Sequence, residues 1–424
     1  MTTQASTAQA GYIGSPQRTA LAERLGGPAG LLGTPGFLRL ALSNALSHSF
    51  GMRMQGVTIA WVVLELTGSK MWLGIVNGTP AISIVLFSLF AGVLADSRDA
   101  RRVLATVRAA LAATAFIVAV LTFAGQVRVE HLILYALIVM GLSAMDMPMG
   151  RTLTLQVVGQ ARLMNANAMQ TMVMNVISIV TPMSIAVVIG LAGSGAAFLL
   201  LSAGYALGAL LMLKTRVSAP PISRGSNALA DLAAGVAYVR TSPKIRGLVT
   251  LGFLMPFVGV YFALIPVFAR EVLDGGAGSL GLLVGSFSLG SLVGSIRLVT
   301  SGPMGGRGRK MISLSLAFGA GMVAFSFSQS LLLSCAISLS MGFLGVYWQN
   351  LLTTMVQTES APEMRGRALS LFTMGFQLAS LGWLIGGVTA SVLGPELALI
   401  IAGGCFAGFS SLVLALNGEA RLID

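Results

Sequence analysis

The stretch GVLADSRDARRVL, residues 92–104, places a short charged turn between two long apolar runs. It holds two aspartates and three arginines, in a chain of 424 residues of which 55% are hydrophobic and only 9% are charged. Soluble domains carry roughly 25% charged residues. The flanking runs are therefore expected to cross a lipid bilayer, with the charged turn at the membrane surface.

The remaining apolar runs extend this prediction along the whole chain. A bilayer core about 30 Å thick needs about 20 apolar residues per helix. By that measure we expect an all-α membrane protein with twelve transmembrane helices. The predicted spans are Phe37–Leu64, Met71–Ala95, Val103–Ala124, His131–Leu155, Leu163–Leu191, Gly195–Leu213, Leu248–Ala269, Leu280–Leu298, Met311–Phe327, Leu331–Met355, Ala368–Val392 and Leu397–Leu416.

An internal repeat indicates that the spans form two parallel six-helix halves. LELTGSKMWLGIVNG, residues 64–78, resembles VLDGGAGSLGLLVGS, residues 272–286, and DARR resembles GRGRK at the corresponding distance. Two parallel six-helix halves are a plan of secondary transporters, with the substrate site between them. The predicted units are a tail over 1–36, halves over 37–214 and 246–417, a link over 215–245 that contains an amphipathic helix, and a tail over 418–424.

The basic residues predict the orientation. Lysines and arginines gather in the connections that lead from even-numbered to odd-numbered spans, which places these connections and both termini in the cytoplasm. The formal net charge of +12 is thereby explained as an orientation signal. Because the charges are scattered over short loops, no nucleic-acid partner is expected. The two cysteines, Cys335 and Cys405, lie far apart in apolar runs and are read as core residues.

The opening stretch, with its order G-x-L-A-D-x-R…R-R, resembles the loop between the second and third helices of the major facilitator superfamily. Further along the chain, WVVLELTGS, LMNANAMQTM, TSPKIRGLV and MRGRALSLF resemble the branch that contains siderophore and macrolide exporters. The resemblance implies a conformational latch that closes the cytoplasmic side against the helix beginning near residue 365. Its members would be Gly92, Asp96, Arg98, Arg101 and Arg102. Simple anchoring by the positive charges is the alternative, and it would not need Asp96 or Gly92.

Charged and polar residues inside the spans are candidates for function, because burying them in a membrane is costly. Asp146 is the first candidate for proton coupling and His48 the second. Asp146 could instead form a standing ion pair with Arg53 or Arg151, and His48 could be structural. Arg53 and Asp146 are the charges expected in the membrane interior. Related exporters commonly have an acid where this chain has Arg53, which favours an anionic or zwitterionic substrate.

A mixed polar and aromatic cavity is expected between the halves. On the first helix, Asn44, His48 and Gln55 are expected to share one face. The fifth helix keeps Pro182 but lacks the glycines that antiporters of the superfamily often show around it. The candidates for the cavity are Asn44, Arg53, Gln55, Asn175, Tyr261, Tyr347, Gln349, Asn350, Gln377 and Trp383.

An enzymatic function is not expected. The chain has two histidines, no HExxH, no cysteine cluster and no phosphate-binding loop after a strand. We expect a proton-coupled exporter of amphiphilic small molecules, monomeric, without a cofactor or metal, in the plasma (inner) membrane. Uptake, lipid flipping, and a membrane sensor or scaffold that transports nothing are the alternatives.

Overall fold

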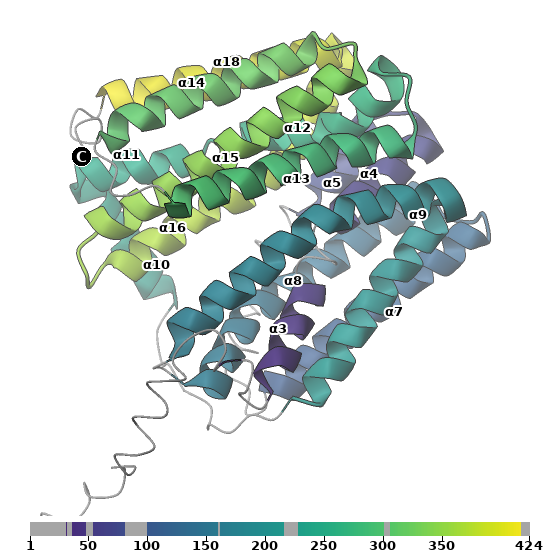
Figure 1. Ribbon diagram of the computed structural model, residues 1–424, viewed down its shortest axis with the longest axis horizontal. Helices are drawn as coiled ribbons and strands as arrows, with labels where there is room; N and C mark the ends of the chain where they lie inside the picture. The colour runs from purple at the N-terminus through teal and green to yellow at the C-terminus, as the bar shows by residue number, and fades with distance from the viewer. Residues whose placement is uncertain are drawn as a thin grey trace, which may run out of the picture.

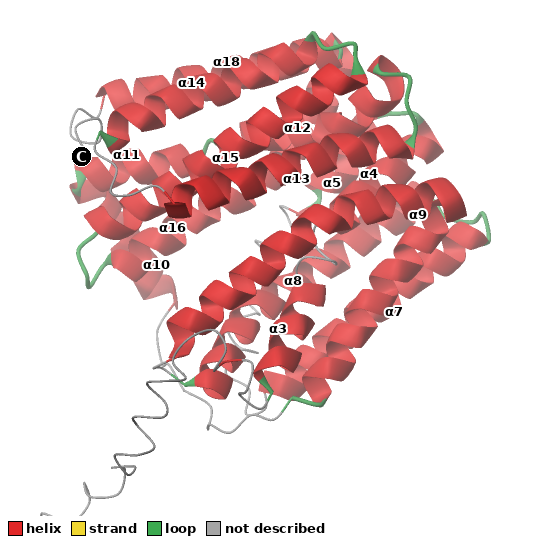
Figure 2. Cartoon of the chain, viewed as in Figure 1, coloured by secondary structure: helices red, strands yellow, loops and turns green. Residues whose placement is uncertain are grey.

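The computed structural model describes residues 31, 36–47, 54–80, 100–159, 162–215, 228–300 and 306–416. These residues are nearly all helical, and the connections between the helices are short (Figure 2). The latch residues Gly92, Asp96 and Arg98 lie outside the described residues, as do His48 and Arg53.

By their order in the chain, the helices fall into an N-terminal and a C-terminal group (Figure 1). The N-terminal group comprises α3 (Phe37–Ala45), α4 (Met54–Thr67), α5 (Lys70–Gly78), α7 (Ala100–Phe123), α8 (Val129–Val158) and α9 (Leu163–Leu213). The C-terminal group comprises α10 (Ala228–Thr241), α11 (Pro243–Gly252), α12 (Met255–Val267), the π-helix η3 (Phe268–Val272), α13 (Ala277–Thr300), α14 (Arg307–Ser326), α15 (Leu331–Glu359), α16 (Arg365–Gln377), α17 (Ala379–Leu393) and α18 (Pro395–Leu416).

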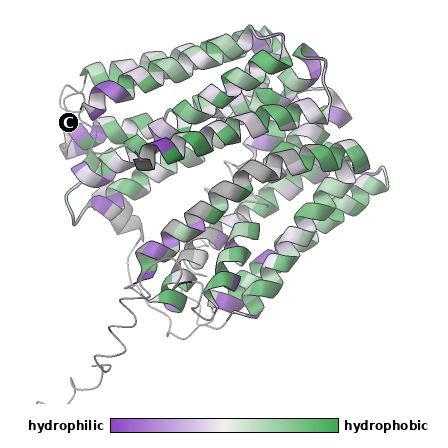
Figure 3. Ribbon diagram, viewed as in Figure 1, coloured by the Kyte–Doolittle hydropathy of each residue, from purple (hydrophilic) through white to green (hydrophobic). Residues whose placement is uncertain are grey.

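Eight helices within the described residues are long and apolar enough to cross a bilayer. Hydrophobic residues run along the helices, and hydrophilic residues gather mainly towards the helix ends (Figure 3). Large apolar side chains such as Leu191 (85% exposed) and Leu332 (82% exposed) point away from the protein, as expected of a surface that faces lipid. The eight spans are 100–123, 129–146, 187–213, 243–272, 277–297, 331–359, 365–393 and 395–416.

The long helix α9 contains a break that separates two of the predicted spans. Gly193 has φ 79° and ψ 174°, a conformation that is open to glycine but strained for other residues. Leu163–Leu191 and Gly195–Leu213 were the spans expected on either side, so the break falls between them. A helix also forms at 228–241, within the predicted link. It packs against α16 and α11, and the hydroxyl of Tyr238 accepts a hydrogen bond from the Ala361 backbone N–H at 3.0 Å.

Contacts between the two groups run through α5 with α17 and through α9 with α13. Figure 1 shows the groups drawing together near α5, α9 and α13 and spreading apart towards α8 on one side and α16 on the other. Within the C-terminal group, α13 and α15 pack closely because Gly290 and Gly342 leave room for the opposing backbone at Leu339 and Phe287. The arrangement brings α4, α5 and α8 opposite α12, α13 and α17.

Candidate functional site

A cavity of about 380 Å³ lies between the two groups and is lined by helices of both. We call it the central cavity. The N-terminal group contributes α4, α5 and α8, and the C-terminal group contributes α12, α13, α16 and α17. The lining is aromatic and polar but holds no charged side chain among the described residues. Its polar and aromatic residues are Gln55, Asn77, Ser143, Ser288, Ser291, Ser380, Phe262, Phe287, Phe376 and Trp383.

The two groups meet tightly at the end of the molecule where α5 begins and η3 ends. A Cβ atom on Gly74 would lie 2.8 Å from the Cα of Gly387, and one on Gly387 would lie 2.5 Å from the Cα of Gly74. Both distances are shorter than any ordinary contact, so only glycine permits α5 and α17 to approach this closely. This glycine contact closes one end of the space between the groups.

Two polar contacts join the groups at the same closed end. Lys70 Nζ lies 2.8 Å from Glu271 Oε2, and Arg270 Nη1 donates to the backbone carbonyl of Leu64 at 2.7 Å. Lys70 and Glu271 are 23% and 37% exposed, so water screens this ion pair and its contribution is small. The glycine contact therefore determines the fit, and the ion pair adds to it.

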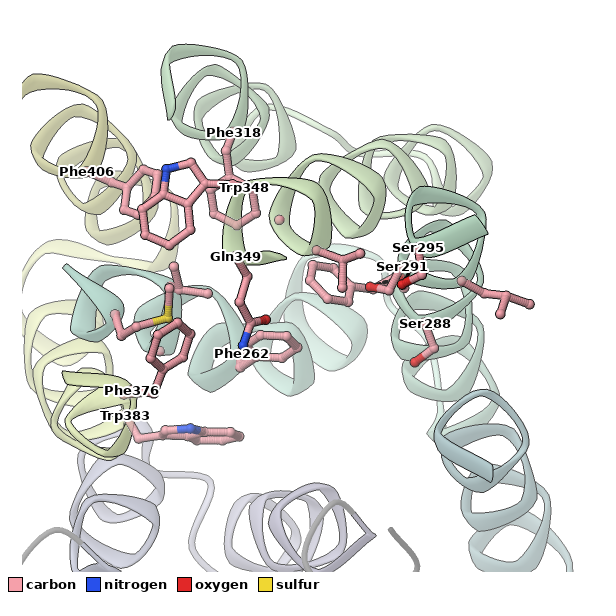
Figure 4. A pocket seen from close by; sticks show the side chains of 18 residues that line it. Phe262, Ser288, Ser291, Ser295, Phe318, Trp348, Gln349, Phe376, Trp383 and Phe406 are labelled. Carbon is pink, nitrogen blue, oxygen red and sulfur yellow. Dashed lines mark hydrogen bonds between the residues drawn. The ribbon is translucent and has the colours of Figure 1, made fainter. Parts of the chain in front are cut away.

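A second cavity of about 260 Å³ opens inside the C-terminal group, and we call it the side cavity. It shares Phe262, Phe287, Ser288, Ser291 and Trp383 with the central cavity, together with Phe376 and Ala379, so the two are adjoining spaces. Figure 4 shows the three serines of α13 on one side, Phe262 in the middle, and Phe318, Trp348, Phe376, Trp383 and Phe406 on the other side. Its lining, as far as the structure describes it, is uncharged.

The N-terminal group instead buries an ion pair. Arg108 on α7 donates from Nε to Asp146 Oδ1 on α8 at 2.8 Å, and the two side chains are only 1% and 7% exposed. Neither residue lines a described cavity. Ser143, however, lines the central cavity and lies one helical turn before Asp146, so the ion pair is close to that cavity.

Side chains of α3 and of Ser47, just after it, complete the surroundings of this pair. Arg108 donates to Ser43 Oγ and, at 2.8 Å, to Asn44 Oδ1, while Ser47 Oγ donates to Asp146 Oδ2 at 3.0 Å. We call these five residues the ion-pair cluster. A buried charge is tolerated when it is paired and its remaining hydrogen-bonding positions are satisfied, and both conditions hold here.

The cluster extends to α9 through amide and hydroxyl groups. Asn44 Nδ2 donates to Gln170 Oε1 at 3.4 Å, and Gln170 Nε2 donates to Thr154 Oγ1 at 3.0 Å. Ser43 Oγ donates to the carbonyl of Gly208 at 2.5 Å. This network of hydrogen bonds therefore links α3, α7, α8 and α9. A change at Asp146 would alter the hydrogen bonds between these helices.

Arg108 is a further buried charge that the sequence did not indicate, beside Asp146, while Arg53 lies outside the described residues. The alternative for Asp146 was a standing ion pair with Arg53 or Arg151; the partner that the structure describes is Arg108, and the side chain of Arg151 is not described. Arg108 follows the predicted start of its span, Val103, by only five residues. An arginine there can normally reach the membrane surface along its own stem, so the sequence carries no sign of its burial.

The cavity candidates fall in different places. Gln55 and Trp383 line the central cavity, and Trp383 and Gln349 line the side cavity. Asn44 belongs to the ion-pair cluster, whereas Gln55 lines the central cavity. Residues 48–53, which connect them and include His48, lie outside the described residues, so the shared face remains a prediction.

The remaining candidates lie outside the described cavities or outside the described side chains. Tyr261 is buried and donates to Ser338 Oγ at 2.9 Å; Tyr347 stacks on Phe343 with ring centroids 6.0 Å apart. Asn350 Nδ2 donates to the carbonyl of Val346 at 3.0 Å. The side chains of Asn175 and Gln377 are not described.

Sequence reasoning missed the serines of α13. Ser288, Ser291 and Ser295 recur at intervals of three and four residues, which places them on one helix face, and all three line the side cavity. That interval was the available signal. It was hidden because serine is common in apolar helices, where its hydroxyl bonds to the helix backbone.

The chain matches a known protein family over residues 34–420, and the family is described as "Transmembrane secretion effector", within the major facilitator superfamily. The staphyloferrin A transporter of Staphylococcus aureus is 23% identical over 344 residues, which is 80% of this chain and 85% of that protein. The enterobactin exporter EntS of Shigella boydii is 26% identical over 219 residues, 51% of this chain and 52% of the exporter.

Solved transporter structures share the fold. A bacterial homologue of the human lysosomal transporter Spinster, in an inward-facing and occupied conformation, superposes with a TM-score of 0.71 at 15% identity, over 97% of this chain and 98% of that one. The nucleoside transporter NupG superposes with a TM-score of 0.66 at 17% identity, over 92% of this chain and 99% of that one.

Proposed function

This chain belongs to the transmembrane secretion effector family of the major facilitator superfamily, and on that premise we propose that it is a proton-coupled exporter of amphiphilic small molecules working by alternating access. It is a multi-pass membrane transporter and not an enzyme. The enterobactin exporters and the staphyloferrin A transporter favour siderophores or related metabolites as substrates and the bacterial inner membrane as the location.

The central cavity is the observation that carries this proposal. Both groups line it, and among the described residues the close contact of Gly74 with Gly387 brings them together at one end. A rocking motion that separates these glycines and joins the opposite ends would expose the same cavity to the other side of the membrane. Substrate-sized volume and an aromatic, polar lining suit an amphiphilic molecule.

The architecture that goes with this mechanism is twelve transmembrane helices in two parallel six-helix halves, over 37–214 and 246–417. Lysine and arginine on the even-to-odd connections support cytoplasmic termini and a cytoplasmic link over 215–245. On this orientation the closed end of the central cavity faces away from the cytoplasm, and the protein works as a monomer.

For proton coupling we propose Asp146, with His48 as the alternative. A proton on Asp146 would cancel the negative charge that compensates the buried Arg108. The guanidinium would then favour a conformation in which water or another acceptor reaches it. Substrate binding and protonation would thereby compete for the conformational equilibrium of the same protein.

The cytoplasmic latch of Gly92, Asp96, Arg98, Arg101 and Arg102 remains part of the proposal. Arg101 donates to the carbonyl of Thr215 at 3.2 Å and to that of Leu213 at 3.4 Å, both at the end of α9. Asp96→Asn should impair transport and leave substrate binding intact, because the proposed latch belongs to the cytoplasmic surface and not to the cavity between the halves. Wild-type transport rates would favour anchoring by the arginines alone.

Reconstituted protein tests the proposed function. Proteoliposomes that are acidic inside should accumulate enterobactin, staphyloferrin A or a neutral aromatic amphiphile, and nigericin, which collapses the pH difference, should abolish the accumulation. Protein-free liposomes are the control. Equal accumulation with nigericin contradicts proton coupling. Failure to accumulate any of the three, together with no exchange of preloaded compound, favours a sensor or scaffold.

A further inference from the structure

The side cavity is enclosed by aromatic rings that already contact one another. The rings of Phe262 and Phe287 meet edge to face with centroids 4.9 Å apart, and Phe406 lies 5.3 Å from Phe318 and 5.4 Å from Trp348. In Figure 4, Trp383 and Phe376 lie on the side of the cavity nearest the N-terminal group. Walls of this kind accept a flat ring by stacking or by edge-to-face contact.

The serines of α13 give the cavity its hydrogen-bonding character. Ser288 Oγ donates to the carbonyl of Val284 at 2.9 Å, Ser291 Oγ to that of Phe287 at 3.0 Å, and Ser295 Oγ to that of Ser291 at 2.9 Å. A hydroxyl has one hydrogen to donate and two lone pairs. Since each hydrogen is used by the helix backbone, these oxygens remain as acceptors for a ligand.

The other polar groups fit the same pattern. Trp348 Nε1 already donates to Ser315 Oγ at 2.8 Å, so its N–H is engaged. Gln349 reaches between the rings in Figure 4. Its amide oxygen can accept a hydrogen bond from a ligand, as the serine oxygens can, and its amide nitrogen can donate one. A ligand in this space therefore meets more acceptors than donors.

Charge decides which hydrogen-bond donor fits. An anion would face serine lone pairs, and no basic side chain lines the cavity among the described residues. A cation would find no carboxylate, because none lines either cavity among the described residues, and attraction to the ring faces offsets only part of the water that it loses. An uncharged hydroxyl or amide N–H avoids both costs.

We infer that the side cavity is a subsite for an uncharged aromatic group that carries a hydrogen-bond donor, such as a phenolic ring, on the transported molecule. This inference rests on the proposed function, since it names the substrate class of the same site. Because the side cavity shares Phe262, Ser291 and Trp383 with the central cavity, a molecule bound centrally can extend one ring into it.

Four matched probes test the subsite: 4-phenylphenol, its methyl ether 4-methoxybiphenyl, biphenyl-4-carboxylate and the cation of 4-phenylbenzylamine. Binding is measured by calorimetry on the full chain in lipid nanodiscs, with empty nanodiscs subtracted. The phenol should bind at least about fivefold more tightly than the ether, the fold-change of one hydrogen bond. The carboxylate and the ammonium should bind more weakly than the phenol.

Variants locate the effect. The first variant is Ser295→Ala, at a serine that lines the side cavity and not the central one, and the second is Ser288→Ala. Each should weaken binding of the phenol about threefold to fivefold and leave binding of the ether unchanged. Ser340→Ala is the matched control, because Ser340 makes the same backbone bond, to the Ala336 carbonyl at 3.0 Å, on an exposed face outside both cavities.

Three results would overturn the subsite: equal affinity for the phenol and the ether, tighter binding of either charged probe, or phenol binding that Ser295→Ala and Ser288→Ala leave unchanged. None of them touches the proposed function, which stands or falls on pH-driven accumulation in proteoliposomes. Conversely, serine-dependent binding of the phenol without any transport would keep the subsite and reject the exporter.

Discussion

The N-terminal group buries an ion pair away from the central and side cavities, and the C-terminal group builds a side cavity that no described charge lines. Arg108 and Asp146 are paired, buried and hydrogen-bonded through α3, whereas the side cavity offers aromatic rings and serine oxygens. The two regions therefore suit different tasks. On the proposed function, a proton would act on the buried ion pair, whereas a ligand would act on the uncharged aromatic cavity through its shape and hydrogen bonds.

The separation also explains how the tasks can be coupled. Ser143, on the wall of the central cavity, and Asp146 share α8, and Gly74 with Gly387 joins the two groups at the closed end. Protonation and substrate binding need not touch the same atoms, because each biases how the groups pack against one another. Variants at the ion pair and at the contact between α5 and α17 can therefore separate the two tasks.

Removing Arg108 should produce the largest loss of stability. Arg108→Leu leaves Asp146 buried without its counter-charge, and breaking a buried pair in this way costs about 3–5 kcal/mol. The double variant Arg108→Leu/Asp146→Leu should recover most of the loss, because neither charge then remains. Thermal unfolding of the purified protein measures both.

The matched control for this prediction is Arg246→Leu, which removes an exposed arginine of α11 and should change stability by less than about 0.5 kcal/mol. If the Arg108→Leu protein unfolds at the wild-type temperature, the ion pair does not stabilise the N-terminal group. The two groups then do not differ in how they depend on buried charge.

The second-largest effect is expected from a variant that keeps α5 and α17 from meeting at the closed end. Gly387→Leu places a side chain against the backbone of α5, and overpacking of this kind costs about 1–3 kcal/mol, or about 5- to 150-fold in the conformational equilibrium. Transport should fall accordingly. An impermeant thiol reagent applied from the closed end should label Asn77→Cys faster, in a background with Cys335 and Cys405 replaced by alanine.

Gly404→Leu provides the comparison, since a Cβ atom at Gly404 meets nothing within 4 Å. Labelling of Asn77→Cys at the wild-type rate in the Gly387→Leu protein would show that the contact between α5 and α17 does not control access to the central cavity.

The smallest effect is expected from the ion pair at that same end. Lys70→Gln removes a partly exposed pair worth about 0.2–1 kcal/mol, so labelling of Asn77→Cys should rise by at most about fivefold. The effect should vanish in about 1 M salt, because screening already weakens the pair in the wild type. A larger or salt-independent effect would mean that the pair, and not the glycines, closes this end.

Local patterns were sufficient to predict helices and several membrane spans, because hydropathy over about 20 residues depends on near neighbours. The break at Gly193 falls between two predicted spans because the apolar run is also interrupted there in the sequence. The partner of Asp146 could not be predicted, because it depends on how α7 packs against α8 and not on the spacing of either helix. Arg108 has the same surroundings in the sequence as an anchoring arginine.

The candidate site was predictable where one side chain acts alone and not where several act together. Gln55, Gln349 and Trp383 line cavities because polar or aromatic residues in apolar spans tend to face the interior. Asn44 binds within the ion-pair cluster and Gln55 lines the central cavity, a difference that depends on how the helices pack and not on their spacing in the sequence. The acceptor character of Ser288, Ser291 and Ser295 depends on which carbonyls take their hydrogens, which only the structure shows.

Asp146→Asn separates proton coupling from substrate binding, with transport measured in two ways on the same proteoliposomes. Accumulation driven by a pH difference should be lost, while exchange of substrate down its own gradient should continue, because Asp146 lines neither the central nor the side cavity. Asp274→Asn, the same change in an exposed turn, should preserve both activities. If the Asp146→Asn protein still concentrates substrate against a gradient under a pH difference, Asp146 is structural, the separation of the two tasks is contradicted, and His48 becomes the residue to test.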